Sequence, residues 1–384
     1  MNAQRSVQQV LYQKFKMKKI LLFLFASLFV SVHAQSDKEW AFFRGEKSLT
    51  GFTKAATGDK FSMHWNYKTN GGIKSSPVVA DNKVFIGSND GSVYAFDLGG
   101  ELLWTYNTEV SVEAPPLYLD GVIYVGNLEG IIFAINADDG SLKWKFTTDG
   151  QISGGSSWVW SPDKKSKWII TGSYDYFLYC VDAETGELIW KFEADNYINS
   201  APGTDGEICM IGGCDGYLHM ININDGVEKD KIDAGTYVAS SAAIVDNKAF
   251  YGNYDGDFYC ADMITKENVW HFTAGPFTGS PSIANGKVVI GSQDKHVYCF
   301  DQKTGKVLWK YMTQRKIEGS PVIAKDKVII GSGDGRVYML NLSDGSRIAA
   351  YEIGRAIVGS PAVIEDHVII GALDGRIYCL KTNL

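Results

Sequence analysis

The ten residues GSGDGRVYML, from Gly331 to Leu340, recur in close copy along the chain. Near-identical phrases are GSNDGSVYAF from Gly87, GSQDKHVYCF from Gly291 and GALDGRIYCL from Gly371. Each joins a turn rich in Asp, Asn and Gly, residues that tolerate the positive φ of tight turns, to an alternating strand with β-branched and aromatic residues. The phrase therefore predicts a β-hairpin, and its recurrence predicts a repeat fold.

Alignment on the first glycine of the phrase gives eight copies, spaced 39 to 46 residues apart, at Gly87, Gly126, Gly172, Gly212, Gly252, Gly291, Gly331 and Gly371. The first unit contains four strand patterns, at residues 76–80, 84–88, 93–97 and 102–107, separated by turn residues. About 40 residues per four-stranded unit is typical of propeller blades. The sequence thus predicts an all-β, eight-bladed β-propeller of four-stranded antiparallel blades.

The positions of the outer strands indicate how the ring closes. The chain stops just after the third strand of the eighth unit, while an additional strand pattern, MHWNYKT around Trp65, precedes the first unit. We expect this N-terminal strand to complete the last blade, because the pairing removes a free sheet edge. The predicted propeller covers residues 61–384, and residues 35–60 form an N-terminal leader segment.

Residues 1–34 have the features of a secretory signal peptide. Lys18 and Lys19 precede an apolar run of 11 residues, which is too short for a membrane span, and Val32-His33-Ala34 resembles a cleavage site. Met17 is the expected true start. The first cysteine is Cys180, far from the cleavage site, so the sequence predicts no lipid anchor. We expect a product without a membrane span, in the periplasm or outside the cell.

The net charge of the chain limits the kinds of molecule that it is expected to bind. The chain has 37 basic and 44 acidic side chains, and five of the basic ones lie within residues 1–34, which contain no acidic residue. The remainder carries a net charge near −12, which argues against nucleic acid and anionic membranes as partners. We expect a monomer whose partner is an envelope or extracellular protein, or a small anionic or sugar-like ligand.

The cysteines follow the repeat rather than a disulfide pattern. Four occupy one repeat position, after an aromatic residue, where other copies have Ala or Met; they are Cys180, Cys260, Cys299 and Cys379. A position that accepts Ala, Met and Cys is typical of a small apolar core site, so buried free thiols are expected there. A bridge between Cys209 and Cys214 stays open at this stage.

Other repeated segments resemble a known family. VDAETGELIWKF (residues 181–192) and FDQKTGKVLWKY (residues 300–311) resemble the tryptophan-docking repeat of pyrroloquinoline-quinone (PQQ)-type propellers, and WAFFRGEKSLTG (residues 40–51) resembles the leader found before many of them. The resemblance implies the propeller fold over nearly the whole chain after the signal.

The family has enzymatic and non-enzymatic branches. The resemblance implies PQQ with calcium for its dehydrogenases, which carry an adjacent Cys-Cys pair; this sequence has no adjacent cysteines and no C-x-x-C-H haem site. The length is closer to that of the non-enzymatic propellers that assist outer-membrane protein assembly. We predict no catalytic residue, metal or cofactor, with PQQ and calcium as the alternative.

Two sets of repeated acids are interpreted as turn formers. One set stands in the quoted hairpin, at Asp90, Glu129, Asp175, Asp215, Asp255, Asp294, Asp334 and Asp374. The other follows the third strand, at Asp97, Asp182, Asp262 and Asp301. Binding residues in a repeat protein should break the repeat, and these residues obey it.

Positions that break the repeat lie in the connections between units, which should meet on one face around the central channel. The candidates for ligand or partner binding are Lys74, Glu113, Gln151, Tyr197, Asn199, Tyr237, Arg315, Lys316, Glu318 and Arg355. Their order predicts a basic arc, containing Arg315, Lys316, Arg355 and Lys74, opposite an aromatic arc with Tyr197 and Tyr237.

The predicted function is that of an exported, non-enzymatic binding or scaffold protein that recognises a protein or a small ligand on this face. Two alternatives are a PQQ-dependent dehydrogenase that oxidises alcohols or sugars, and an outer-membrane protein assembly factor. A fold of this kind hosts many functions, so the residues of the site have to decide between them.

Overall fold

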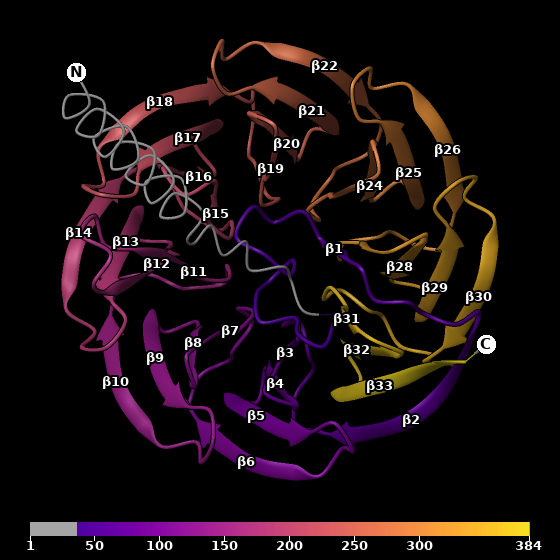
Figure 1. The fold of residues 1–384 in the computed structure, drawn as a ribbon, viewed down its shortest axis with the longest axis horizontal. Coiled ribbons are helices and arrows are strands. Elements are labelled where there is room, and N and C mark those ends of the chain that lie inside the picture. Colours follow the sequence, from indigo (N-terminus) through magenta and orange to yellow (C-terminus); the bar gives the residue numbers. More distant parts are fainter. Residues whose placement is uncertain (1–36, 384) are drawn as a thin grey trace, which may run out of the picture. The chain divides into compact units, whose positions relative to one another are not determined.

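A computed structural model describes residues 37–383 of the 384-residue chain. The predicted signal peptide and its start at Met17 lie outside these residues. Eight sheets stand around a central axis, as Figure 1 shows, and every regular element among the described residues is a β-strand. None of the described residues belongs to a helix long and apolar enough to cross a bilayer. The predicted eight-bladed propeller is confirmed.

Blades 1 to 4 each contain four antiparallel strands, numbered outward from the axis. Blade 1 is formed by β3 (Val78–Ala80), β4 (Lys83–Gly87), β5 (Ser92–Asp97) and β6 (Leu102–Asn107). Blade 2 is formed by β7 (Leu117–Leu119), β8 (Val122–Gly126), β9 (Ile131–Asn136) and β10 (Leu142–Thr147). Blade 3 is formed by β11 (Ser157–Trp160), β12 (Lys167–Gly172), β13 (Phe177–Asp182) and β14 (Leu188–Glu193). Blade 4 is formed by β15 (Gly203–Thr204), β16 (Ile208–Gly212), β17 (Tyr217–Asn222) and β18 (Glu228–Asp233).

Blades 5 to 7 repeat this order. Blade 5 is formed by β19 (Ala243–Val245), β20 (Lys248–Gly252), β21 (Asp257–Asp262) and β22 (Asn268–Thr273). Blade 6 is formed by β23 (Ser282–Ala284), β24 (Lys287–Gly291), β25 (His296–Asp301) and β26 (Val307–Met312). Blade 7 is formed by β27 (Val322–Ala324), β28 (Lys327–Gly331), β29 (Arg336–Asn341) and β30 (Arg347–Glu352).

Blade 8 is assembled from both ends of the described chain. It combines β31 (Ala362–Ile364), β32 (His367–Gly371) and β33 (Arg376–Asn383) with β2 (Lys60–Lys68) as its outer strand. Strand β2 pairs antiparallel with β33, with Trp65 opposite Cys379; in Figure 1 the indigo β2 lies beside the yellow β33. The predicted closure by the strand around Trp65 is confirmed.

The leader, residues 37–59, follows the inner strands around the ring, and part of it is the indigo trace at the centre of Figure 1. Its strand β1 (Phe52–Thr53) pairs in parallel with β27, so blade 7 has five strands rather than the predicted four. Backbone hydrogen bonds join the leader to seven blades in order, pairing Asp37 with Glu365, Trp40 with Val79, Ala41 with Tyr118, Lys47 with Thr204, Ser48 with Ile244, Thr50 with Ile283 and Gly51 with Ile323. The ammonium of Lys47 also lies 3.1 Å from the ring centroid of Trp158 in blade 3. The leader therefore contacts all eight blades.

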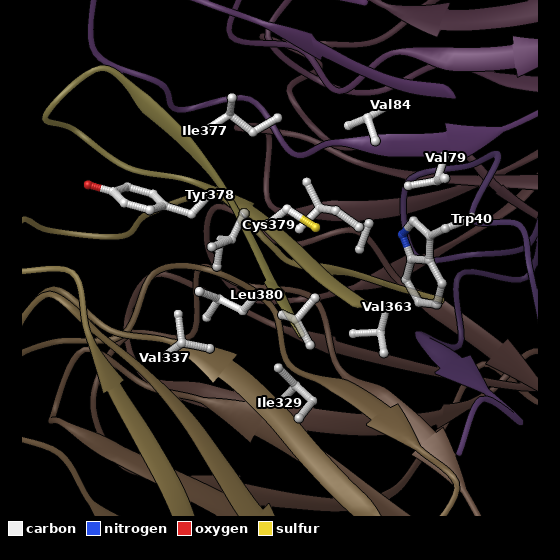
Figure 2. Close-up of a cluster of buried hydrophobic side chains, with 14 of the residues drawn as sticks. Trp40, Val79, Val84, Ile329, Val337, Val363, Ile377, Tyr378, Cys379 and Leu380 are labelled. Atoms are coloured by element: carbon white, nitrogen blue, oxygen red, sulfur yellow. The ribbon is translucent and has the colours of Figure 1, made fainter. Parts of the chain in front are cut away.

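Apolar clusters fill the space between neighbouring blades. The largest joins blades 7, 8 and 1 and includes Trp40 of the leader, which lies near Val79 and Val363 in Figure 2. Cys379 is buried in the same cluster, between its chain neighbours Tyr378 and Leu380. The four cysteines of the predicted core position are all buried and free, as expected. Cys209 and Cys214 are also free, so the structure contains no bridge between them.

Candidate ligand-binding face

The connections between blades and the hairpins between second and third strands lie on the same side of the ring, which we call the loop face. In blade 1, the Asp90 carboxylate accepts hydrogen bonds from the Ser92 N–H (3.0 Å) and the Tyr94 hydroxyl (2.8 Å). The same pair of contacts holds the hairpins of Asp175, Asp294, Asp334 and Asp374. These repeated acids are turn formers, as predicted, and the hairpins give the loop face a rigid frame.

In blades 2 and 5 an asparagine, rather than the repeated acid, accepts the backbone hydrogen bond that holds the hairpin. In blade 2 the Asn127 side chain, two positions before Glu129, accepts from the Ile131 N–H at 3.0 Å. In blade 5 Asn253 accepts from the Asp257 N–H at 2.8 Å. Glu129 and Asp255 are thus replaced as turn formers by the asparagine that precedes them.

Four of the predicted site residues meet at the central channel, namely Lys74, Glu113, Asn199 and Glu318. The Lys74 ammonium lies 2.7 Å from Glu113 Oε1, across two blades, and the Lys316 ammonium lies 2.9 Å from Glu318 Oε1. Both lysines are therefore neutralised by nearby carboxylates. The predicted basic arc is reduced to Arg315 and Arg355.

A belt of serine hydroxyls ties the channel wall together. Each hydroxyl accepts from a backbone N–H of the neighbouring blade at 2.8–3.0 Å, in the pairs Ser360 to Ser76, Ser320 to Ser360, Ser280 to Ser320, Ser241 to Ser280 and Ala201 to Ser241. The blades approach so closely that a Cβ on Gly319 would lie 2.6 Å from the Gly359 carbonyl oxygen. The inner edges of the blades that line the channel therefore lie close together and are held by these hydrogen bonds.

The channel does not fit the quinone cofactor of the PQQ-type dehydrogenases. Its cavity is about 160 Å³, whereas sites for ligands of cofactor size are about 300–1,000 Å³. Within residues 37–383, no three His, Cys, Asp or Glu side chains are grouped so that they could hold a metal ion. We therefore derive no chemistry through a quinone or calcium at this channel.

An open groove of about 830 Å³ lies on the loop face between blades 7 and 8. Arg315 and Arg355, from two successive connections, line it together with Arg336 and Glu352, whose side chains form an ion pair at 2.9 Å. Asp334 and Asp374 also line the groove, but their carboxylates are held by the hairpin contacts described above. The groove thus offers two exposed guanidinium groups to an anionic ligand.

Blades 3 to 5 carry a surface of tyrosines on the same face. Tyr197 stacks on Tyr174 with ring centroids 5.0 Å apart, and Tyr176 lies 5.4 Å from it. A second pair of tyrosines follows on this face: Tyr237 lies in the connection from blade 4 to blade 5, and the N–H of Tyr254, in the hairpin of blade 5, donates to its carbonyl at 3.0 Å. The side chains of Tyr176, Tyr197, Tyr237 and Tyr254 are 40–53% exposed. We call these five residues the tyrosine surface.

Sequence reasoning identified Tyr197 and Tyr237 but missed Tyr174, Tyr176 and Tyr254. The missed residues lie in the repeated hairpin, which the sequence analysis treated as purely structural. A signal was present, because Tyr176 occupies a position that is glycine in six of the eight copies and has positive φ in all of them. The exposed Gln151 is the remaining candidate; its carbonyl accepts from the Tyr174 N–H at 2.9 Å and so supports this surface.

Comparison with protein families gives two matches. Residues 154–384, more than half of the chain, match the family described as the beta-propeller of beta-alanine-activating enzyme. Residues 46–164 match the family described as outer membrane protein assembly factor BamB. No curated protein matches the sequence.

Solved structures share the fold at low sequence identity. BamB from Moraxella catarrhalis superposes with a TM-score of 0.72 at 19% identity, over 84% of this chain and 99% of that chain. The quinohemoprotein alcohol dehydrogenase from Comamonas testosteroni superposes with a TM-score of 0.79 at 13% identity, over 92% of this chain and 82% of that chain. The resemblance to PQQ-type propellers is confirmed, and both of these solved structures share the propeller fold.

Proposed function

The chain belongs to the beta-propeller family of beta-alanine-activating enzyme, and we propose that within this family it is a monomeric, non-enzymatic binding protein that holds a segment of a partner protein on its loop face. The observation that carries the proposal is the tyrosine surface. Exposed tyrosines provide large, rigid contact area at low entropic cost and are enriched at the centres of protein interfaces. The surface lies where the repeat is broken, so the fold alone does not require it.

The rest of the loop face supports the same role. The groove with Arg315 and Arg355 lies in blades 7 and 8, away from the tyrosines of blades 3 to 5. A segment with aromatic or apolar residues at one end and carboxylates at the other would satisfy both regions, since guanidinium groups pair well with carboxylates. We propose such a segment as the ligand.

The assembly-factor match supports an envelope protein as the source of this segment, and a function in outer-membrane protein assembly. The predicted signal peptide is consistent with that location. The channel offers no support for the dehydrogenase alternative, because its cavity is only about 160 Å³ and no three His, Cys, Asp or Glu side chains of residues 37–383 are grouped as metal ligands.

Site-specific photo-crosslinking in the native envelope tests the proposal. A photoreactive residue replaces Tyr237, and in a matched control it replaces Leu188, which is 47% exposed on the outer strand β14. We expect one defined adduct from position 237 and none from position 188. The double substitution Y174A/Y197A should weaken the adduct at least about tenfold, as expected for hot-spot aromatics.

Equal adducts from both positions, or an adduct unaffected by Y174A/Y197A, would contradict binding through the tyrosine surface. The non-enzymatic part is tested separately by adding pyrroloquinoline quinone and calcium to the purified chain. Dye-linked oxidation of an alcohol or sugar would overturn it.

A further inference from the structure

Blade 3 departs from the repeat on the face opposite the loop face, where the turns between first and second strands lie. Its turn has six residues, 161–166, whereas the same turn of blade 1 has two. Trp160, which is 43% exposed, stands where blade 1 has the turn residue Asp81. The Ser161 N–H donates to the Ser166 carbonyl at 2.9 Å and closes the turn. The longer turn thus holds an exposed tryptophan at a position where the fold does not require one.

Two tryptophans and two lysines meet at this turn, and we call them the indole–lysine cluster. The rings of Trp158 and Trp160 are 5.8 Å apart between centroids, with an interplanar angle of 77°. The Lys167 ammonium lies 4.9 Å from both centroids. Lys47 of the leader completes the cluster, with its ammonium 3.1 Å from the centroid of Trp158. The four side chains therefore form one contiguous surface.

The cluster carries an uncompensated positive charge. Lys167 forms an ion pair with Asp120, whose side chain is 66% exposed. Among residues 37–383, the partly exposed Lys47 has neither an ion pair nor a hydrogen bond for its ammonium. Burial and the charge of Lys167 lower the pKa of Lys47 to about 8, so the group is still mostly charged at neutral pH. Its three N–H donors are thus available to an anionic group.

The indoles add directional donors and an apolar surface. Trp104 on the outer strand of blade 1 donates its Nε1–H to the Ala137 carbonyl at 3.1 Å. Within residues 37–383 no acceptor pairs in this way with Trp158 or Trp160. Hydroxyl groups suit this surface, because they can accept from the indoles and donate to the Asp120 carboxylate. The exposed ring of Trp160 provides a flat apolar area for the C–H face of a sugar ring.

We propose that the indole–lysine cluster binds an acidic sugar, a pyranose that carries a carboxylate. The carboxylate accepts from the Lys47 ammonium, and the ring packs on Trp160. The hydroxyls pair with the indole N–H groups and with Asp120. The cluster lies on the opposite face from the tyrosine surface and from the groove with Arg315 and Arg355. The sugar and the partner segment therefore do not compete.

Saturation-transfer NMR on the purified chain tests the site with three probes, D-glucuronate, D-glucose and acetate. Glucuronate should bind saturably, and the other two at least about tenfold more weakly, because glucose lacks the charge and acetate lacks the ring. W160A should weaken glucuronate at least about tenfold, as expected for an aromatic contact at the centre of a site. K47M should weaken it in the same direction.

Two matched controls come from third-to-fourth-strand turns on the same face. I264A removes an apolar side chain that is 67% exposed, and K303M removes an exposed lysine. Both should bind glucuronate as the wild-type protein does.

No saturable binding of glucuronate would overturn the proposal, and so would binding that W160A leaves unchanged. Glucose bound as tightly as glucuronate would exclude the ammonium contact, and acetate bound as tightly would exclude recognition of the sugar ring. If K47M does not fold, because Lys47 also anchors the leader, W160A and the three probes decide. Crosslinking from position 237 tests the loop face separately, so failure of one proposal leaves the other intact.

Discussion

The outer wall of the ring and its loop face are built from the same repeat but use it in opposite ways. On the outer wall the repeat is obeyed: Trp104 of blade 1 covers Gly140 of blade 2, and its Nε1 donates to the Ala137 carbonyl at 3.1 Å. The same contact is made by Trp65, Trp144, Trp190, Trp270 and Trp309. On the loop face the repeat is broken by Tyr176 and its neighbours. The repeated tryptophans thus stabilise the contacts between blades, whereas the departures on the loop face are the ones that we propose to serve recognition.

Two of the interfaces between neighbouring blades, which we call seams, lack the tryptophan, and each has its own explanation. Between blades 4 and 5, Asp230 stands at the tryptophan position and pairs at 2.7 Å with Lys266, which replaces the glycine beneath it. Between blades 7 and 8, Ala349 stands there instead, because the outer strand of blade 8 comes from β2 and no hairpin is available for a tryptophan to cover. Because β2 closes the ring, the contact between blades 7 and 8 does not require a tryptophan at this repeat position.

The largest expected effect breaks the outer wall. Trp190 is 8% exposed, covers Gly226 and donates to the Ile223 carbonyl at 3.1 Å. W190A should lower the free energy of unfolding by about 3–5 kcal/mol, measured by urea denaturation, because a large buried aromatic is lost. W160A, at a tryptophan that is 43% exposed, serves as the control and should cost less. An equal loss in W160A would contradict a special role for the seam.

A smaller effect of opposite sign is expected on the loop face. Tyr176 has a φ of 77°, so Y176G should raise the free energy of unfolding by about 1 kcal/mol, since glycine adopts this conformation without strain. The same variant should weaken the crosslink from position 237. K295G changes the equivalent position of blade 6, where φ is 80°. It should also raise the free energy of unfolding, but it should leave the crosslink from position 237 unchanged. If Y176G binds normally, the tyrosine does not contribute to recognition.

The smallest expected effect concerns the hairpin of blade 4, where His219 replaces the tyrosine found in most other hairpins. Its Nε2 lies 2.7 Å from Asp215 and its Nδ1 lies 2.6 Å from Glu228. Burial acts to lower the pKa of His219, but the two hydrogen bonds and the charges of both carboxylates outweigh burial and raise it above its usual value of about 6.5.

The protonated histidine is thus favoured in the folded state. Its stabilising contribution is complete below about pH 6.5 and is lost as the pH rises through the raised pKa. Urea denaturation between about pH 5 and pH 9 should show this decline in the wild-type protein and not in H219Y. H271N, at an exposed histidine, should keep the decline. Identical pH profiles for the wild-type protein and H219Y would show that the buried histidine does not titrate in this range.

Strand positions and ring closure were predictable because they depend on a pattern that occurs eight times. The third strand of the first unit, predicted at residues 93–97, is Ser92–Asp97, and the strand around Trp65 closes the ring. The path of the leader was not predictable. Its residues show no alternation, and the inner strand edges that accept β1 exist only once the blades have formed.

The candidate site was predictable in part for the same reason. Tyr197 was found because it interrupts the repeat within a connection, whereas Tyr176 lies inside a hairpin whose other members are structural. The pairing of Lys74 with Glu113 joins residues 39 positions apart. Such a contact depends on how neighbouring blades are spaced, and no local pattern encodes it.

The pairing of β2 with β33 also has a consequence for the order of events during synthesis. Strand β2 leaves the ribosome early, yet its partner ends at Asn383, and the Asp59 N–H donates to the Asn383 carbonyl at 2.8 Å. Contacts between such distant residues form slowly, because a long loop has to close first. Blades 1 to 7 can thus acquire their strands from β3 to β30 while the nascent chain grows, but the eighth waits for the final residues, and until then β2 is an unpaired edge.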